Sequence, residues 1–143
     1  MKLLTGRPLK VGWYWDIESV DLRNYVVINK FIKNRYKNVE VTKIMSTSLK
    51  NEYRFTQLNK KRGFHNFSSY DGKNAADYTL LGMLHYNRDE HDVIVIVSND
   101  KIFERYLTNL KQHIWQFYTH KCDFKQSSKV EYTKLYKVFK RNK

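Results

Sequence analysis

The sequence contains very little cysteine, proline or glycine. Its 143 residues include one cysteine, one proline and five glycines. The single cysteine, Cys122, excludes an internal disulfide and is typical of a protein in a reducing compartment. Because proline and glycine are scarce and no internal repeat is visible, there is little material for linkers. We therefore expect a single domain over residues 1–143.

The chain also lacks a long apolar run. No stretch reaches the roughly 18 apolar residues that a membrane-spanning helix needs. The first ten residues include Lys2, Arg7 and Lys10, which leave no room for the apolar centre of a secretory signal. The sequence therefore predicts a cytoplasmic protein without a membrane partner.

Acidic residues are the scarce charge. There are 27 Lys+Arg against 14 Asp+Glu, which gives a formal net charge of +13. Such an excess indicates an anionic partner, and nucleic acid is the first candidate. Basic residues cluster at 33–37, at 60–62 and in the tail from about residue 121. A single cluster is usually a solvated face, but three of them predict at least one phosphate-binding surface whose affinity falls steeply with salt.

Short apolar runs alternate with helix-like segments along the chain. The runs that predict strands cover residues 10–15, 39–45, 64–68, 92–97 and 114–118. The segments that predict helices cover residues 22–36, 49–61, 71–84, 100–110 and, within the basic tail, 128–140. This alternation predicts a parallel sheet covered on both faces. The expected fold class is α/β, a Rossmann-like three-layer α/β/α sandwich with a mostly parallel sheet of about five strands.

The few acidic side chains stand where such a sheet binds its ligands. Asp16 and Glu18 directly follow the first predicted strand, and Asp100 follows the fourth. Glu104 comes four residues after Asp100, on the same face of a helix, and Asp77 lies near the start of the preceding helix. If the first and fourth strands are neighbours, these carboxylates converge at the carboxyl end of the sheet.

Converging carboxylates need compensation. They repel one another and raise one another's pKa, and a divalent cation relieves that cost. Oxygen ligands without cysteine or histidine suit Mg²⁺ or Mn²⁺ rather than Zn²⁺. With a polyanionic partner, the chemistry that fits is metal-assisted phosphodiester hydrolysis with one or two ions. The structural alternative is that Asp100 only caps a helix and that Asp16 is a solvated loop residue.

Three segments resemble motifs of the PIN-like nuclease superfamily, in particular its NYN-type branch. Residues 15–20 (Trp-Asp-Ile-Glu-Ser-Val) resemble its Asp-x-Glu-Asn opening, and residues 72–81 resemble its Lys-Asn-Ala-hydrophobic-Asp helix motif. Residues 95–104 resemble its Ser-x-Asp-x-Gly-Phe-Asp motif. The resemblance spans residues 10–118. This chain departs from the pattern at three positions, where it has Ser19 for Asn, Ile102 for Gly and Glu104 for Asp.

The resemblance implies a function and a set of site residues. It implies a PIN-like fold and a metal-dependent endonuclease acting on single-stranded or structured RNA, with RNA favoured over DNA. Since members of the superfamily often dimerise, it also implies a homodimer. The implied catalytic metal ligands for Mg²⁺ or Mn²⁺ are Asp16, Asp77, Asp100 and Glu104, with Glu18 as a further ligand or a residue just behind the ligands.

Residues beside the acids are candidates for holding the phosphate backbone. Lys73 and Asn74 lie one turn before Asp77, where a cation and an amide can contact a phosphate. Ser98, Asn99 and Lys101 surround the start of the next helix, where free amide groups favour anions. The structural alternative is that Lys73 only forms an exposed ion pair with the nearby acid.

Three tyrosines are candidates for contacts with bases. Tyr70, Tyr118 and Tyr132 are placed to stack on unpaired bases.

Two other functions are alternatives to a nuclease. A non-catalytic PIN-like module would use the same surfaces to hold RNA or a partner protein. A phosphatase on a doubly wound fold is disfavoured, because Glu18 stands where an aspartyl-phosphate mechanism usually has a second aspartate.

Overall fold

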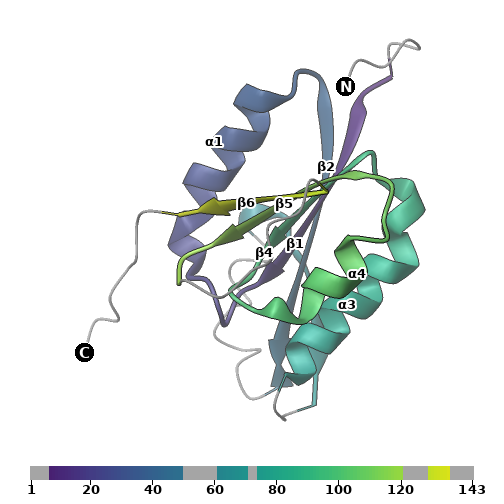
Figure 1. Cartoon of the computed structure of the whole chain (residues 1–143). Coiled ribbons are helices and arrows are strands. Elements are labelled where there is room, and N and C mark those ends of the chain that lie inside the picture. Colours follow the sequence, from purple (N-terminus) through teal and green to yellow (C-terminus); the bar gives the residue numbers. More distant parts are fainter. Residues whose placement is uncertain (1–6, 50–60, 71–73, 121–128, 136–143) are drawn as a thin grey trace.

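The computed structural model describes residues 7–49, 61–70, 74–120 and 129–135 (Figure 1). Within them, six strands form one parallel sheet in the order β3-β2-β1-β4-β5-β6. The strands are β1 (Leu9–Asp16), β2 (Val39–Ser48), β3 (His65–Ser69), β4 (Val93–Val97), β5 (His113–Tyr118) and β6 (Val130–Lys134). The helices are α1 (Tyr25–Arg35), α3 (Ala75–Asn87) and α4 (Glu104–Leu107), with 3₁₀ turns η1 (Leu22–Asn24), η3 (Arg88–Glu90) and η4 (Lys101–Phe103).

The helices cover both faces of the sheet. α1 lies on one face, and α3 and α4 lie on the other (Figure 1). Because successive side chains of a strand point to opposite faces, β1 contributes Trp13 and Trp15 to the α1 face and Tyr14 to the α3 face. The predicted α/β class is confirmed, with six parallel strands rather than about five. Among the described helices, none is both long enough and apolar enough to cross a bilayer.

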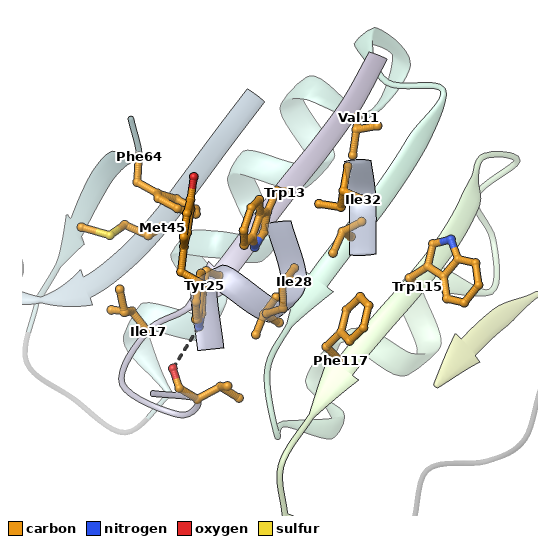
Figure 2. Packing of buried hydrophobic residues seen from close by; sticks show 14 of the residues in the cluster. Val11, Trp13, Ile17, Tyr25, Ile28, Ile32, Met45, Phe64, Trp115 and Phe117 are labelled. Carbon is orange, nitrogen blue, oxygen red and sulfur yellow. Dashed lines mark hydrogen bonds between the residues drawn. The ribbon is translucent and has the colours of Figure 1, made fainter. Parts of the chain in front are cut away.

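Aromatic residues pack under α1 and fix the chain that leaves β1 (Figure 2). The ring of Trp13 stacks on Trp15 and on Tyr25, with centroids 5.6 and 5.1 Å apart, and Phe64 meets Trp13 edge-on at 5.2 Å. The indole N–H of Trp15 donates to the backbone carbonyl of Val20 at 2.9 Å. This packing holds the loop after β1 against the core, so that the acidic residues in and beside it have a defined position.

The opposite face holds α3 against the centre of the sheet. Leu80 and Leu84 of α3 are fully buried in a cluster that includes Ile94 and Ile96 of β4. Burying each such side chain contributes about 1.5–3 kcal/mol. The same packing brings the first turn of α3 to the carboxyl end of the sheet, where β1 also ends.

A buried polar pair lies on the α3 face, away from that end. The Tyr14 hydroxyl and Nε2 of His91 are 2.6 Å apart. Gly12 makes room for this pair, because a Cβ built there would lie 2.5 Å from the His91 ring. Glycine at this position is therefore required by the close approach of a side chain.

The basic tail departs from its prediction. The helix predicted over 128–140 is wrong for its first half, because Val130–Lys134 forms strand β6, which pairs in parallel with β5. Val130 is buried while Glu131 and Lys134 are exposed, and tyrosine and threonine between them favour strands. Pairing with the open edge of β5 thus overrides the helical spacing. Residues 136–140 and nearly all of the helix predicted over 49–61 lie outside the described residues.

Candidate active site

The acidic residues gather where the strand order reverses. β1 pairs with β4 on one side and with β2 on the other, so the chain winds in opposite directions from this point. Ligands of such sheets bind beyond the carboxyl ends of the strands at this place. The first and fourth strands are neighbours, which is the condition on which the expected convergence of the carboxylates depended. A cavity of about 570 Å³ opens there, and its lining includes Asp16, Glu18, Asn74, Asp77, Asp100 and Lys101.

Asp16 is the last residue of β1, and its side chain is nearly inaccessible. The residue is 5% exposed, and its Oδ2 accepts a 3.1 Å hydrogen bond from the Ser98 hydroxyl. Burial raises the pKa of Asp16, while hydrogen bonds from Asp77 and Ser98 oppose the rise. The chain turns at once after β1, because the amides of Ser19 and Val20 both donate to the Asp16 carbonyl.

Asp77 lies in the first turn of α3 and links the other two carboxylates. It is 7% exposed. Burial raises the pKa of Asp77 most, followed by hydrogen bonding to Asp16 and Asp100 and by their negative charges. These contributions all favour the protonated form, in which Asp77 donates to its neighbours. Three carboxyl groups from three segments of the chain therefore interact in one place.

Asp100 caps a helix and also belongs to the acidic cluster. It is the N-cap of η4, since its Oδ1 accepts a 3.0 Å hydrogen bond from the amide of Ile102. It also lines the cavity and raises the pKa of Asp77. Capping uses one carboxylate oxygen, so it does not remove Asp100 from the acidic cluster.

Glu18 is exposed at the rim of the cavity and is held by a residue that the sequence analysis missed. Its Oε1 accepts a 2.5 Å hydrogen bond from the amide of Ser48, the last residue of β2. Ser48 also lines the cavity. The polar run Ser46-Thr47-Ser48 at the end of a strand was the available signal, because β2 lies next to β1 in the sheet.

Ser98 and Asn99 hold the site together through hydrogen bonds inside the protein, and Asn99 also lines the cavity. Ser98 is fully buried, and its hydroxyl donates to Asp16 and accepts from the amide of Asp100 at 3.0 Å. The Asn99 amide group donates to the Ser19 carbonyl and to the Thr119 hydroxyl, and its carbonyl accepts from the Thr119 amide. The sequence had suggested phosphate contacts for Ser98 and for the backbone amides that open the helix at Asn99 and Asp100, and that role stays a prediction. The hydrogen bonds of the Asn99 side chain join the segments that follow β1 and β5 to the end of β4.

Asn74 and Lys101, two further residues predicted to bind phosphate, also line the cavity. Asn74 precedes α3 in the left-handed region, with φ of 62°, a conformation that asparagine tolerates better than most residues. Its side chain is exposed and makes no capping hydrogen bond to the helix. Lys101 is exposed and also lines the cavity. Lys73, the third candidate, lies outside the described residues.

Glu104 has a different environment from the three clustered aspartates. It begins α4 but is not among the residues that line the cavity, and its charge raises the pKa of Tyr132 on β6, after the larger effect of burial. The reason is η4, which separates the two acids by a tighter 3₁₀ turn. A 3₁₀ helix turns about 120° per residue, so positions four apart no longer share a face as they do in an α-helix. The role of Glu104 as a metal ligand stays a prediction.

The donor set fits a hard cation in chemistry but is not arranged around one. Among the residues that the structure describes, no three Asp, Glu, His or Cys side chains form a ready-made metal site. The cluster instead accommodates a proton, chiefly on Asp77. Oxygen donors alone and close negative charges suit Mg²⁺ or Mn²⁺, provided that Asp77 releases its proton and the carboxylates rotate to share the ion.

The basic clusters do not surround this site evenly. Residues 33–37 lie at the end of α1 and directly before β2. They are therefore at the amino ends of the strands, opposite to the carboxyl ends where the acidic residues lie. Within and beside the clusters, Arg35 packs over the Trp115 ring at 5.6 Å and Arg62 over the Tyr25 ring at 4.6 Å. These two guanidinium groups cover aromatic residues, and such contacts contribute about 0.5–1 kcal/mol at exposed sites. Most of the basic tail lies outside the described residues.

Comparison with known proteins supports the fold but does not assign the chain to a family. The chain matches no family model, and no curated protein matches it. Among solved structures, it is similar to a protein of unknown function from Vibrio parahaemolyticus, with 15% sequence identity and a TM-score of 0.61. The match covers 83% of this chain and 85% of that one. This likeness supports the Rossmann-like parallel α/β fold over most of the domain.

Proposed function

We propose that this protein is a PIN-like, metal-dependent nuclease that hydrolyses phosphodiester bonds, with RNA favoured over DNA. The observation that carries the proposal is the meeting of Asp16, Asp77 and Asp100 at the switch point of the sheet. Two of these groups have a raised pKa, and such clusters of perturbed carboxyl groups in a cavity are typical of functional sites. The net charge of +13 suits a polyanionic substrate.

The metal in this proposal is Mg²⁺ or Mn²⁺, held by Asp16, Asp77 and Asp100. When bound, such an ion acts as a Lewis acid and supplies positive charge to the phosphate oxygens. The structure supports the choice of ligands through their chemistry, since all three are carboxylates that face one cavity. Whether one ion or two bind depends on Glu18 and Glu104 as well.

The surrounding residues position the ligands and the substrate. Ser98 holds Asp16 and the backbone of Asp100 close together. These two carboxylates therefore need to move less to share an ion. Asn74 and Lys101 line the cavity and would contact the phosphate, one through an amide and one through a positive charge. Glu18, exposed at the rim, would accept a hydrogen bond from the attacking water.

Cleavage of labelled single-stranded RNA, with matched DNA in parallel, tests the proposal. We expect cutting by the wild type with Mn²⁺ or Mg²⁺ and none with EDTA. Asp16→Asn and Asp77→Asn should each lower the rate about a hundredfold or more, a typical cost of losing one preorganised electrostatic group. Asp89→Asn is the matched control, because Asp89 is an exposed acid of η3 beyond the far end of α3. Equal rates in all four proteins would contradict the assigned site.

A second candidate function is a non-catalytic module that binds RNA or a partner protein. The observation that favours it is that the described residues include no ready-made metal site, while burial raises the pKa of Asp77 and so favours its uncharged form. Such a module would bind RNA equally well in wild type and Asp77→Asn, and it would cut no substrate with any metal. The same assay therefore separates the two functions.

A further inference from the structure

A second cavity adjoins the acidic one. It also has a volume of about 570 Å³ and lies at the carboxyl ends of β2 and β3, beside the first turn of α3. Ala75 lines both cavities, and Leu49 of the second directly follows Ser48 of the first. A chain of nucleotides whose phosphate lies in the acidic cavity therefore has a neighbouring space for its next group.

Two exposed tyrosine rings border this second cavity. Tyr70 directly follows β3 and is 84% exposed, and Tyr78 on α3 is 61% exposed. The buried aromatic residues pair with one another, as Trp13 does with Tyr25. In the part of the chain that the structure describes, neither Tyr70 nor Tyr78 has such a ring partner. Large aromatic faces left open to water beside a cavity have free surface on which another planar group can stack.

Hydroxyl groups line the same space and can recognise a polar edge. Thr79 and Ser69 use their hydroxyl hydrogens on the carbonyls of Ala75 and Thr47, at 3.0 and 3.4 Å, so their oxygens still accept. The lining thus combines aromatic faces with hydrogen-bond acceptors, which can contact a nucleobase and its polar edge.

We infer that this second cavity binds an unpaired nucleobase next to the phosphate in the acidic site, which makes a single strand the substrate. The inference rests on the proposed function, whose substrate class it narrows. In a duplex the faces of each base are covered by its neighbours, so a tyrosine cannot stack on them without unstacking. A second copy of this chain is a poorer occupant, because each copy carries a net charge of +13.

Binding of a labelled ten-nucleotide RNA, measured by fluorescence anisotropy in EDTA, tests the inference without cleavage. We expect Tyr78→Ala to raise the Kd about tenfold, as the loss of one stacked base does, and Tyr78→Phe to stay within about twofold. Tyr70→Ala should also weaken binding. Tyr86→Ala is the matched control, because Tyr86 is 84% exposed on the same helix but lines neither cavity. The same RNA annealed to its complement should bind wild type and Tyr78→Ala equally.

Several results would overturn the inference. They are an unchanged Kd in both tyrosine variants, an equal loss for duplex and single strand, no binding of the single strand by wild type, and a wild-type dimer that Tyr78→Ala dissociates. A parallel cleavage assay with Mn²⁺ separates this inference from the proposed function. If the wild type cuts RNA and the Kd of the variants is unchanged, the base site is contradicted and the proposed nuclease function is supported. If the variants bind tenfold more weakly and no protein cuts RNA, the base site is supported and the nuclease function is contradicted.

Discussion

The Ser98 hydroxyl donates a 3.1 Å hydrogen bond to Oδ2 of Asp16, although the two residues are 82 positions apart in the chain. The same hydroxyl accepts from the amide of Asp100. One buried group on the residue after β4 therefore fixes the acid that ends β1 and the acid that caps η4. The geometry of the candidate site depends on the pairing of these two central strands.

Replacing this serine should destabilise both the fold and the site. Ser98→Ala removes the donor to a buried carboxylate, and we expect it to lower the free energy of unfolding by about 1–3 kcal/mol. Urea denaturation in EDTA measures this change. Thr108→Ala is the control, because the exposed Thr108 hydroxyl donates only to the nearby Arg105 carbonyl. If Ser98→Ala lowers the free energy of unfolding no more than the control does, the Ser98–Asp16 hydrogen bond does not stabilise the fold.

Removing the charge of Asp77 should stabilise the protein when no metal is present. The folded state raises the pKa of Asp77, so this residue costs stability as the pH rises above its ordinary unfolded value near 4. Asparagine cannot ionise, and Asp77→Asn should therefore raise the free energy of unfolding at pH 8 by about 1 kcal/mol or more. The gain should vanish below about pH 4, where the wild-type carboxyl group is protonated in both states.

Chemical denaturation in EDTA at pH 8 and at pH 3.5 measures this difference. Asp89→Asn supplies the comparison for an exposed acid. If the Asp77→Asn protein is less stable than wild type at pH 8, the carboxyl group of Asp77 does not lower the free energy of unfolding of the metal-free protein, and the prediction is wrong.

The pair formed by Tyr14 and His91 should make stability depend on pH in the opposite direction. Burial lowers the pKa of His91, while the nearby charges of Glu90 and Asp92 oppose the effect. The unfolded chain therefore takes up a proton at a higher pH than the folded protein does. Stability from this group is complete above about pH 6.5 and falls on acidification, by at most about 1.4 kcal/mol per pH unit.

Comparison of His91→Gln with wild type between pH 8 and pH 5 isolates this contribution. The free-energy difference between the two proteins should shrink as the pH falls. His120→Gln, a substitution of an exposed histidine, is the control for this comparison. A difference between wild type and His91→Gln that is constant over this range would contradict the account.

The convergence of Asp16 and Asp100 follows from the sequence, because each lies within three residues of the end of a run that is typical of a buried parallel strand. The carboxyl ends of parallel strands share one edge of the sheet, and only the adjacency of β1 and β4 needed the structure. The position of Glu104 did not follow, since sequence spacing cannot distinguish a 3₁₀ turn from an α-helical one. Strand β6 was missed for a related reason: its five residues become a strand only by pairing with β5.

The supporting contacts were harder to foresee than the acids. Ser48, Asn99 and Ser98 act through partners in distant segments of the chain, so their roles depend on side-chain orientation that periodicity does not specify. The second cavity depends in the same way on the closeness of β3 and α3, which brings Tyr70 and Tyr78 to one space. Sequence patterns located the edge of the sheet at which function is expected, and packing decides which side chains face it.

The central claim is that the carboxyl cluster holds a divalent cation, and direct binding of Mn²⁺ tests it. Titration of Mn²⁺ into the metal-free protein, followed by electron paramagnetic resonance of the free ion, gives the affinity and the number of sites. We predict specific binding by wild type and Asp89→Asn, with affinity at least about tenfold lower in Asp77→Asn and in Asp16→Asn. Equal binding by all four proteins, or no binding by wild type, would contradict the account.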